Sequence, residues 1–132
     1  MPRKNGKPVN KDAGRPGGGL LLRIIGGAWR GRRIHFPPVA AIRPTPDRVR
    51  ETLFNWLQMD VGGSRCLDLY AGSGALGLEA LSRGASSVVF IEVDSGAVRQ
   101  LSQTLHDFQS DRGVVVTDDV KRYLAGPCEP FD

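Results

Sequence analysis

The chain has 132 residues, of which 18 are basic, 14 are acidic and 40% are hydrophobic, and its net charge is +4. This length suits one globular domain and argues against two. No apolar run reaches the roughly 18 residues that a membrane-spanning helix needs, and no charged, apolar and small-residue leader opens the chain. Composition therefore favours a soluble protein that contacts no membrane.

Cysteine usage bears on the cellular compartment. Cys66 and Cys128 lie far apart in the sequence. They match neither a disulfide framework nor the spacing of metal ligands. We therefore expect a cytoplasmic protein without a metal site. We also expect a monomer.

Basic residues are concentrated in the first part of the chain. Residues 1–50 contain 12 basic and 2 acidic side chains, whereas residues 51–132 contain 6 basic and 12 acidic ones. Such asymmetry suggests a basic arm or face that meets a polyanion, attached to an acidic body. A basic tail that is merely solvated is the alternative, and charge alone leaves it open.

Residues 1–19 are rich in Gly, Pro and Lys and have no apolar period, so we expect a disordered basic tail. Residues 20–62 follow as a hairpin and helix extension. In its first half, apolar and basic residues alternate around glycines, which predicts a small β-hairpin with one apolar side. The apolar side would hold Leu22, Ile24, Ile34 and Phe36, and the residues facing solvent would be Arg23, Arg32 and Arg33.

A helix is predicted next, before the glycine pair at positions 62 and 63. Thr45 suits the N-cap, Pro46 the first helical position, and Asp47 the first turn, where it favours the helix dipole. Apolar residues then recur at i, i+4, i+7 and i+8, which predicts a buried stripe. The stripe consists of Val49, Leu53, Trp56 and Leu57, with Arg43, Arg48 and Arg50 at the helix entry or off the stripe.

Residues 63–132 alternate short apolar strands with helices. This order indicates an α/β, Rossmann-like domain built on a parallel sheet with right-handed crossovers. We expect strands at Cys66–Tyr70, Ser87–Ile91 and Val114–Val116, and helices at Ala75–Ser82, Ser95–Phe108 and Val120–Leu124.

A glycine-rich loop, Gly72-x-Gly74-x-x-Gly77, follows the first of these strands, and Glu92 comes 20 residues after its first glycine. This pattern matches the dinucleotide-binding fingerprint. Asp68 argues against a dinucleotide, because a carboxylate at the strand end would repel a pyrophosphate and attract a cation. S-adenosylmethionine carries a sulfonium and an ammonium group and no phosphate, so it fits better than NAD. Alternatively, Asp68 caps a nearby backbone amide.

Two further acids follow the next strands. Glu92 can accept hydrogen bonds from both ribose hydroxyls of either cofactor. Asp119 either accepts a bond from the adenine amino group or forms the N-cap of the helix that follows. The residues themselves leave this second choice open.

Four segments closely resemble the RsmD family of bacterial methyltransferases: RIIGGAWRGRRI, RPTPDRVRETLFNWL, CLDLYAGSGALGLEALSRGA and VVFIEVD. The resemblance runs from about Leu21 to Asp132 and is most specific in Arg43–Leu57. It implies an S-adenosylmethionine-dependent enzyme that methylates the exocyclic N2 of a guanine in small-subunit (16S) ribosomal RNA. The implied partner is 16S ribosomal RNA or the small ribosomal subunit.

The resemblance also implies which residues bind the cofactor. The glycine-rich loop and Asp68 would surround its methionine end, and Thr45 would help to close that pocket. Glu92 would bind the ribose and Asp119 the adenine. The full implied set is Asp68, Tyr70, Ala71, Gly72, Ser73, Gly74, Glu92, Asp119 and Thr45.

Together with the uneven charge, the resemblance implies contacts to ribosomal RNA phosphates. Trp29, between two basic stretches, either stacks on RNA or packs under the hairpin. The implied RNA-binding residues are Arg23, Arg30, Arg32, Arg33, Arg43 and Arg48.

One family feature is missing. Relatives continue with a hydrophobic strand that ends in Asp-Pro-Pro-Phe, and the present sequence contains no such tetrapeptide. In such a motif, the Asp side chain and a proline carbonyl hold the amino nitrogen, and the aromatic ring stacks on the extruded base. We therefore expect an N-terminal part of an enzyme that has no catalytic residue of its own, is inactive alone, and exposes the Cys66–Tyr70 strand as a sheet edge.

Three alternatives to this function stay open. They are a nucleic-acid amino-methyltransferase of other specificity, an NAD-dependent oxidoreductase, and a non-catalytic RNA-binding module. The first shares the cofactor site, and the second is disfavoured by Asp68. The third would use the basic arm and keep the α/β fold only as a scaffold.

Overall fold

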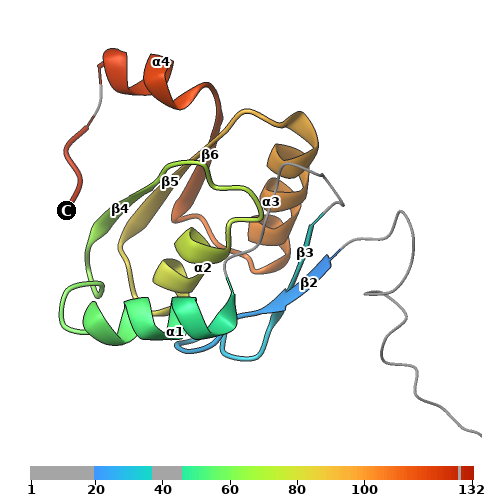
Figure 1. Ribbon diagram of the computed structural model, residues 1–132, viewed down its shortest axis with the longest axis vertical. Helices are drawn as coiled ribbons and strands as arrows, with labels where there is room; N and C mark the ends of the chain where they lie inside the picture. Colours follow the sequence, from blue (N-terminus) through green and yellow to red (C-terminus); the bar gives the residue numbers. More distant parts are fainter. Residues whose placement is uncertain (1–19, 37–45, 128) are drawn as a thin grey trace, which may run out of the picture.

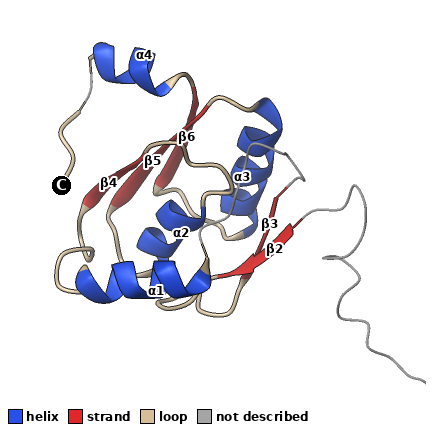
Figure 2. Cartoon of the chain, in the orientation of Figure 1, coloured by secondary structure: helices blue, strands red, loops and turns tan. Residues whose placement is uncertain are grey.

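Two sheets and four helices make up the part of the chain that the computed structural model describes, namely residues 20–36, 46–127 and 129–132 (Figures 1 and 2). None of the described helices is long and apolar enough to cross a membrane. In chain order, the elements are β2 (Leu20–Arg23), β3 (Arg33–Phe36), α1 (Asp47–Trp56), β4 (Arg65–Asp68), α2 (Ala75–Ser82), β5 (Ser87–Glu92), α3 (Ser95–Asp107), β6 (Gly113–Thr117) and α4 (Val120–Ala125).

Several predictions concern residues outside these ranges. They are the tail of residues 1–19, the RNA-binding role of Arg43 and the role of Thr45 in closing the cofactor pocket. The division of the chain at residues 62 and 63 stays a prediction.

The predicted hairpin is confirmed. β2 and β3 pair in antiparallel fashion, with Leu22 opposite Ile34. Ile24 and Ile34 are fully buried on the apolar side. The side chain of Phe36, predicted on the same side, lies outside the described part. The residues predicted to face solvent are exposed: Arg23, Arg32 and Arg33.

The turn of the hairpin lies against the end of α2. Gly27 has a φ of +83°, and a Cβ added there would lie 2.0 Å from the carbonyl oxygen of Ser82. Only glycine combines this left-handed conformation with such a close approach. The N–H of Ala28 donates to the same carbonyl at 2.8 Å. The turn is therefore fixed at the last residue of α2.

The second sheet is parallel, as the alternation of strands and helices predicts, and its order is β4-β5-β6. Phe90 of β5 is fully buried on the face that α2 and α3 cover (Figure 1). A Cβ added to Gly77 of α2 would lie 2.2 Å from the Phe90 ring, so α2 packs close to the strand. A Cβ added to Gly113 would meet both Leu105 of α3 and the Phe90 ring.

The opposite face of this sheet carries a row of apolar residues. Leu67, Val89 and Val114 are partners across the three strands. Leu67 and Val89 are half-buried, and Val114 is 55% exposed. In the part of the chain that the structure describes, this row is only partly covered.

The predicted bounds of the strands and helices in this domain agree with the structure to within one or two residues. The prediction ends the first strand at Tyr70, whereas β4 ends at Asp68. Tyr70 has a φ of +58°, which no β-strand accommodates. The expected edge position of this strand is confirmed among the described strands. At its free edge, the N–H of Asp132 donates to the carbonyl of Arg65 at 2.8 Å.

The start of α1 differs from the prediction. The N-cap is Pro46 rather than Thr45, and the helix itself begins at Asp47. Pro46 has an extended ψ of 150°, so it precedes the first helical turn. Its carbonyl accepts the N–H of Arg50 at 3.0 Å.

The predicted apolar stripe of α1 is also wrong. Val49 and Trp56 are 53% and 76% exposed, and Leu57 is 37% exposed. Leu53 is the one member of the stripe that packs against the described core as a partly buried residue.

A buried ion pair explains this rotation of the helix. Arg50 and Phe54 form the buried side of α1. The guanidinium of Arg50 lies 3.2 Å from a carboxylate oxygen of Glu79, and both side chains are fully buried. Sequence periodicity assigns arginine to the surface, so the predicted stripe is rotated by part of a turn from the side of the helix that is buried.

Close packing of α2 on β5 gives a testable prediction. Gly77→Ala should lower the free energy of unfolding by about 1–3 kcal/mol, because the added methyl group overlaps the Phe90 ring. Gly62→Ala is the matched control, since a Cβ there meets nothing within 4 Å. Urea unfolding measures both changes. Equal stability of the two variants would contradict the packing described.

Candidate functional site

The three parallel strands end at one edge of the sheet, where the predicted cofactor residues lie. β4 ends at Asp68, β5 at Glu92 and β6 at Thr117. The glycine-rich loop runs from the end of β4 to the start of α2 (Figure 1). In open α/β sheets, ligands bind outside such carboxyl ends of strands.

The glycine-rich loop follows a left-handed backbone path. Tyr70, Gly72 and Gly74 have φ values of +58°, +58° and +84°. A Cβ added to Gly74 would lie 2.4 Å from a methyl carbon of Leu101 in α3. Glycine therefore lets the loop turn and approach α3 where a side chain would not fit.

Other predicted loop residues hold this path. The N–H of Ala71 donates to the carbonyl of Ile91 at 2.9 Å, which ties the loop to the end of β5. Ser73 is buried, and its Oγ accepts the N–H of Ala75 at 3.3 Å. Tyr70 is 74% exposed and leaves the loop surface accessible.

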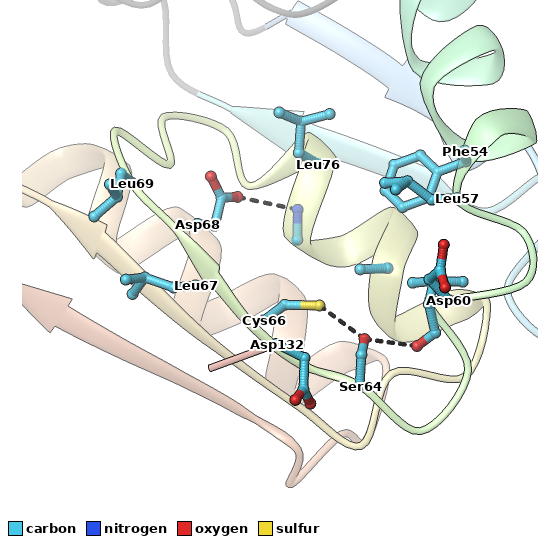
Figure 3. A pocket seen from close by; sticks show the side chains of 13 residues that line it. Phe54, Leu57, Asp60, Ser64, Cys66, Leu67, Asp68, Leu69, Leu76 and Asp132 are labelled. Atoms are coloured by element: carbon cyan, nitrogen blue, oxygen red, sulfur yellow. Dashed lines mark hydrogen bonds between the residues drawn. The ribbon is translucent and has the colours of Figure 1, made fainter. Parts of the chain in front are cut away.

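Asp68 lies beneath the loop, at the start of α2 (Figure 3). Its Oδ2 accepts the N–H of Gly77 at 3.0 Å, so the capping alternative is what the structure shows. Burial raises the pKa of Asp68 to about 6, the hydrogen bond from Gly77 lowers it, and the charge of Glu92 raises it further. A carboxylate that is poorly stabilised by its surroundings gains most from a nearby cation.

Glu92 connects two loops at the strand ends. Its Oε1 accepts the N–H of Gly72 at 2.8 Å, and its Oε2 accepts the N–H of Asp94 at 2.9 Å. Each carboxylate oxygen has capacity for a further donor. Sequence reasoning missed this organising role, although the spacing to the first glycine pointed to the residue.

Asp119 forms the N-cap of α4. Its carboxylate accepts the N–H of Arg122 at 3.2 Å, which confirms the capping alternative. The side chain is exposed at the same sheet edge as Asp68 and Glu92. The cap therefore leaves the carboxylate open to a second donor.

Five of the six predicted RNA-binding arginines lie in the described part, and all five are exposed. Four belong to the hairpin, whose turn is fixed at Ser82. Ser82 is the last residue of α2, and the first residue of this helix lies about 12 Å away along the helix axis. Arg23 and Arg33 are brought together as partners across the hairpin strands, and the hairpin turn is bound to the end of α2 that is away from the glycine-rich loop. The five exposed arginines are Arg23, Arg30, Arg32, Arg33 and, on α1, Arg48.

Two hairpin residues pack against the end of α3. The guanidinium carbon of Arg32 lies 4.0 Å from the centre of the Phe108 ring, and Nη2 donates to the carbonyl of Asp107 at 3.3 Å. The ring of Trp29 lies 4.8 Å from the Phe108 ring, centre to centre. Trp29 therefore packs under the hairpin, as one of its two predicted roles requires.

A groove of about 680 Å³ lies along the free edge of β4, between β4, α2 and the end of α1 (Figure 3). Asp68, Cys66 and Ser64 of the β4 region line this groove. The Sγ of Cys66 lies 3.2 Å from the Oγ of Ser64. The apolar lining includes Phe54, Leu57, Leu67, Leu69, Leu76 and Ala80.

A parallel sheet with acidic residues after successive strands, next to a glycine-rich loop, defines a Rossmann-like fold. Solved structures that share this fold with the chain include a putative methyltransferase and a putative methylase, so the fold is of the S-adenosylmethionine-dependent methyltransferase class. The chain belongs to the family described as conserved hypothetical protein 95, which matches residues 22–132. This result confirms the resemblance seen in the sequence.

Curated relatives and solved structures agree with this assignment. The chain is 47% identical over 111 residues to ribosomal RNA small subunit methyltransferase D of Escherichia coli, covering 84% of this chain and 56% of that protein. The Haemophilus influenzae protein of the same name is 44% identical over 108 residues, with 80% and 56% covered. A solved Escherichia coli structure, a putative methyltransferase, has a TM-score of 0.77 at 47% identity, covering 85% of this chain and 62% of that one.

The chain spans about half the length of the curated relatives that it matches. Family membership and fold therefore rest on the matched part. Activity, substrate and partner of the whole protein are matters for a proposal.

The environment of Asp68 predicts a pH-dependent effect on stability. The pKa of Asp68 is raised from 3.8 to about 6, so the folded protein binds a proton at Asp68 more tightly than the unfolded chain does. The protonated side chain therefore favours the folded state fully below about pH 4, and this stability is lost as pH rises through 6. Asp68→Asn keeps an acceptor for Gly77 and carries no charge. The variant should be more stable than wild type by up to about 3 kcal/mol at pH 8 and equally stable at pH 4.

Urea unfolding between pH 4 and pH 8 measures this difference. Asp132→Asn provides a control of opposite sign, because a hydrogen bond from Arg65 lowers the pKa of Asp132. A stability difference between Asp68→Asn and wild type that does not change with pH would contradict the account.

Proposed function

We propose that the chain is the cofactor- and RNA-binding part of an enzyme that methylates the N2 amino group of a guanine in small-subunit ribosomal RNA. The observation that carries this proposal is a partly buried carboxylate, Asp68, beside a glycine-rich loop at the carboxyl edge of a parallel sheet. Family membership and the names of the relatives support RNA methylation.

The residues at this edge fit S-adenosylmethionine. Asp68 offers a negative charge to the positively charged methionine end, and Glu92 offers free acceptor capacity to ribose hydroxyls. Asp119 is exposed near the same edge for the adenine amino group. When bound, this cofactor supplies an activated methyl group on a sulfonium. Thr45, which would close the methionine end, remains a proposal from family resemblance.

An NAD-dependent oxidoreductase fits less well. A pyrophosphate at the glycine-rich loop would lie near Asp68, whose negative charge is already disfavoured by burial and by Glu92. A second negative group would raise this cost, whereas a cation would lower it.

RNA recognition is assigned to the exposed arginines of the hairpin and of α1. Arg23 and Arg33 are partners across β2 and β3, so two guanidinium groups emerge side by side. Arginine forks match phosphate geometry, and such contacts position RNA without reading its sequence. Because the hairpin turn is bound to the end of α2 that is away from the glycine-rich loop, we assign the exposed arginines to the RNA backbone flanking the target base.

We propose that methyl transfer needs residues beyond this chain. The sequence contains no Asp-Pro-Pro-Phe to hold the amino group of the guanine. The free edge of β4 and the apolar row Leu67, Val89 and Val114 offer surfaces on which a further strand and helices would pack. By itself, the chain should bind its ligands and leave RNA unmethylated.

Cofactor binding tests the first half of the proposal. Asp68→Ala should weaken S-adenosylmethionine binding by about 10–100-fold, the effect expected when a charged partner is lost. Isothermal titration calorimetry measures the affinity, and Asp111→Ala, which removes an exposed acid elsewhere, is the matched control. Binding of NAD in place of S-adenosylmethionine would favour the oxidoreductase. Absence of both would favour the RNA-binding module.

RNA binding tests the second half. Arg33→Ala and Arg48→Ala should each weaken binding to a 16S ribosomal RNA transcript and reduce the salt dependence of log Kd by about one phosphate contact. Cofactor affinity should stay the same. Lys121→Ala, on α4, removes the same charge from another part of the molecule and should change neither. Equal losses in all three variants would indicate binding by net charge alone.

A further inference from the structure

Glu79 is a fully buried carboxylate in the middle of α2 that the proposed chemistry does not use. Its Oε1 accepts the N–H of Ile25 at 3.0 Å and Nη1 of Arg50 at 3.2 Å. Its Oε2 accepts the N–H of Gly26 at 2.9 Å and Nε of Arg83 at 2.8 Å. One side chain thus joins the hairpin turn, α1 and α2.

Further hydrogen bonds connect the hairpin to α1 and to the end of α2. Arg50 also donates from Nη1 to the carbonyl of Arg23 at 3.0 Å, so α1 holds the end of β2. Ser82, one turn after Glu79, accepts the N–H of Trp29 at 2.9 Å and donates to the carbonyl of Gly26. The hairpin turn is therefore fixed to the second half of α2 by hydrogen bonds with the side chains of Glu79 and Ser82.

The first half of α2 belongs to the cofactor site. Gly74 is its N-cap, and the N–H of Gly77 is bonded to Asp68. Glu79 comes two residues after Gly77, and the helix is only 8 residues long. A helix of this length is a rigid spacer of about 12 Å. Its two ends carry the glycine-rich loop and the arginine-bearing hairpin.

We propose that Glu79 is a positioning residue, which fixes the RNA-binding hairpin at a set distance and angle from the methyl-donor loop through α2. This role rests on the function proposed above. Buried carboxylates are retained only with several partners, because their desolvation is costly. Glu79 spans three separate elements with its four donors, which a capping or surface role would not require. The expected consequence concerns where bound RNA lies and only weakly how tightly it binds.

A directed cleavage experiment separates position from affinity. In a Cys66→Ser, Cys128→Ser background, Val93→Cys places a label at the sheet edge, where Val93 is 69% exposed. An iron chelate on this cysteine cleaves nearby nucleotides of a bound 16S ribosomal RNA transcript. Cuts confined to one short stretch are expected with the wild-type residue at position 79.

Glu79→Gln replaces an acceptor of four N–H groups by a side chain that brings donors of its own. RNA affinity should stay within about threefold, because every arginine remains. The focused cuts should weaken several-fold and spread to neighbouring nucleotides. Glu51→Gln, which neutralises an exposed acid on α1, should leave the cuts unchanged.

Ser82→Ala decides the question if Glu79→Gln does not fold, because it removes two of the anchoring hydrogen bonds and little volume. Spreading of the cuts in either folded variant supports the positioning role. Unchanged cuts in the folded variants overturn it and leave the proposed function standing. Failure of the wild-type chain to bind RNA overturns the proposed function, and the positioning role with it.

Discussion

A carboxylate placed at the end of the first parallel strand, under a glycine-rich loop, is the constraint on which the site depends. Asp68 is partly buried and accepts the N–H of Gly77, and the charge of Glu92 adds repulsion. The negative charge therefore costs free energy in the folded protein at neutral pH. A fold that keeps such a charge gains most from a ligand that is positive where it meets the loop.

Close packing makes this placement possible. Gly77 lets α2 approach the Phe90 ring, and Gly74 lets the loop approach Leu101 of α3. The start of α2 is thereby held beside the end of β4, where the N–H of Gly77 donates to Asp68. Glu92 then accepts backbone N–H groups from two loops, and the bond from Gly72 ties the loop after β4 to the end of β5. The glycines that allow close packing of α2 and the loop therefore also place the N–H groups that Asp68 and Glu92 accept.

Much of the fold follows from local sequence. Strand and helix positions in residues 63–132 are predictable because apolar periodicity and glycine stops agree with each other. The acids of the site are predictable because they follow strands of a parallel sheet. Their hydrogen bonds are less so: Asp68 and Asp119 each had two open roles, and only geometry shows both as caps.

The orientation of α1 was not predictable from its own sequence. Its periodicity favours a stripe with Val49 and Trp56, yet the buried side carries Arg50. The cause is Glu79, 29 residues further along the chain, which lies within the otherwise apolar α2. A pairing over that separation leaves no local pattern in a single sequence. The same limitation hid the attachment of the hairpin to α2.

The ionisation of Asp68 in the presence of ligand tests the central claim most directly. Carbon-13 NMR of the aspartate carboxyl groups, with Asp68→Asn for assignment, reports the pKa of Asp68 in the free and bound chain. The account predicts a pKa of about 6 without ligand, a clear fall with S-adenosylmethionine, and a smaller fall with S-adenosylhomocysteine, which lacks the sulfonium charge. A pKa that rises or stays unchanged when S-adenosylmethionine binds would contradict it.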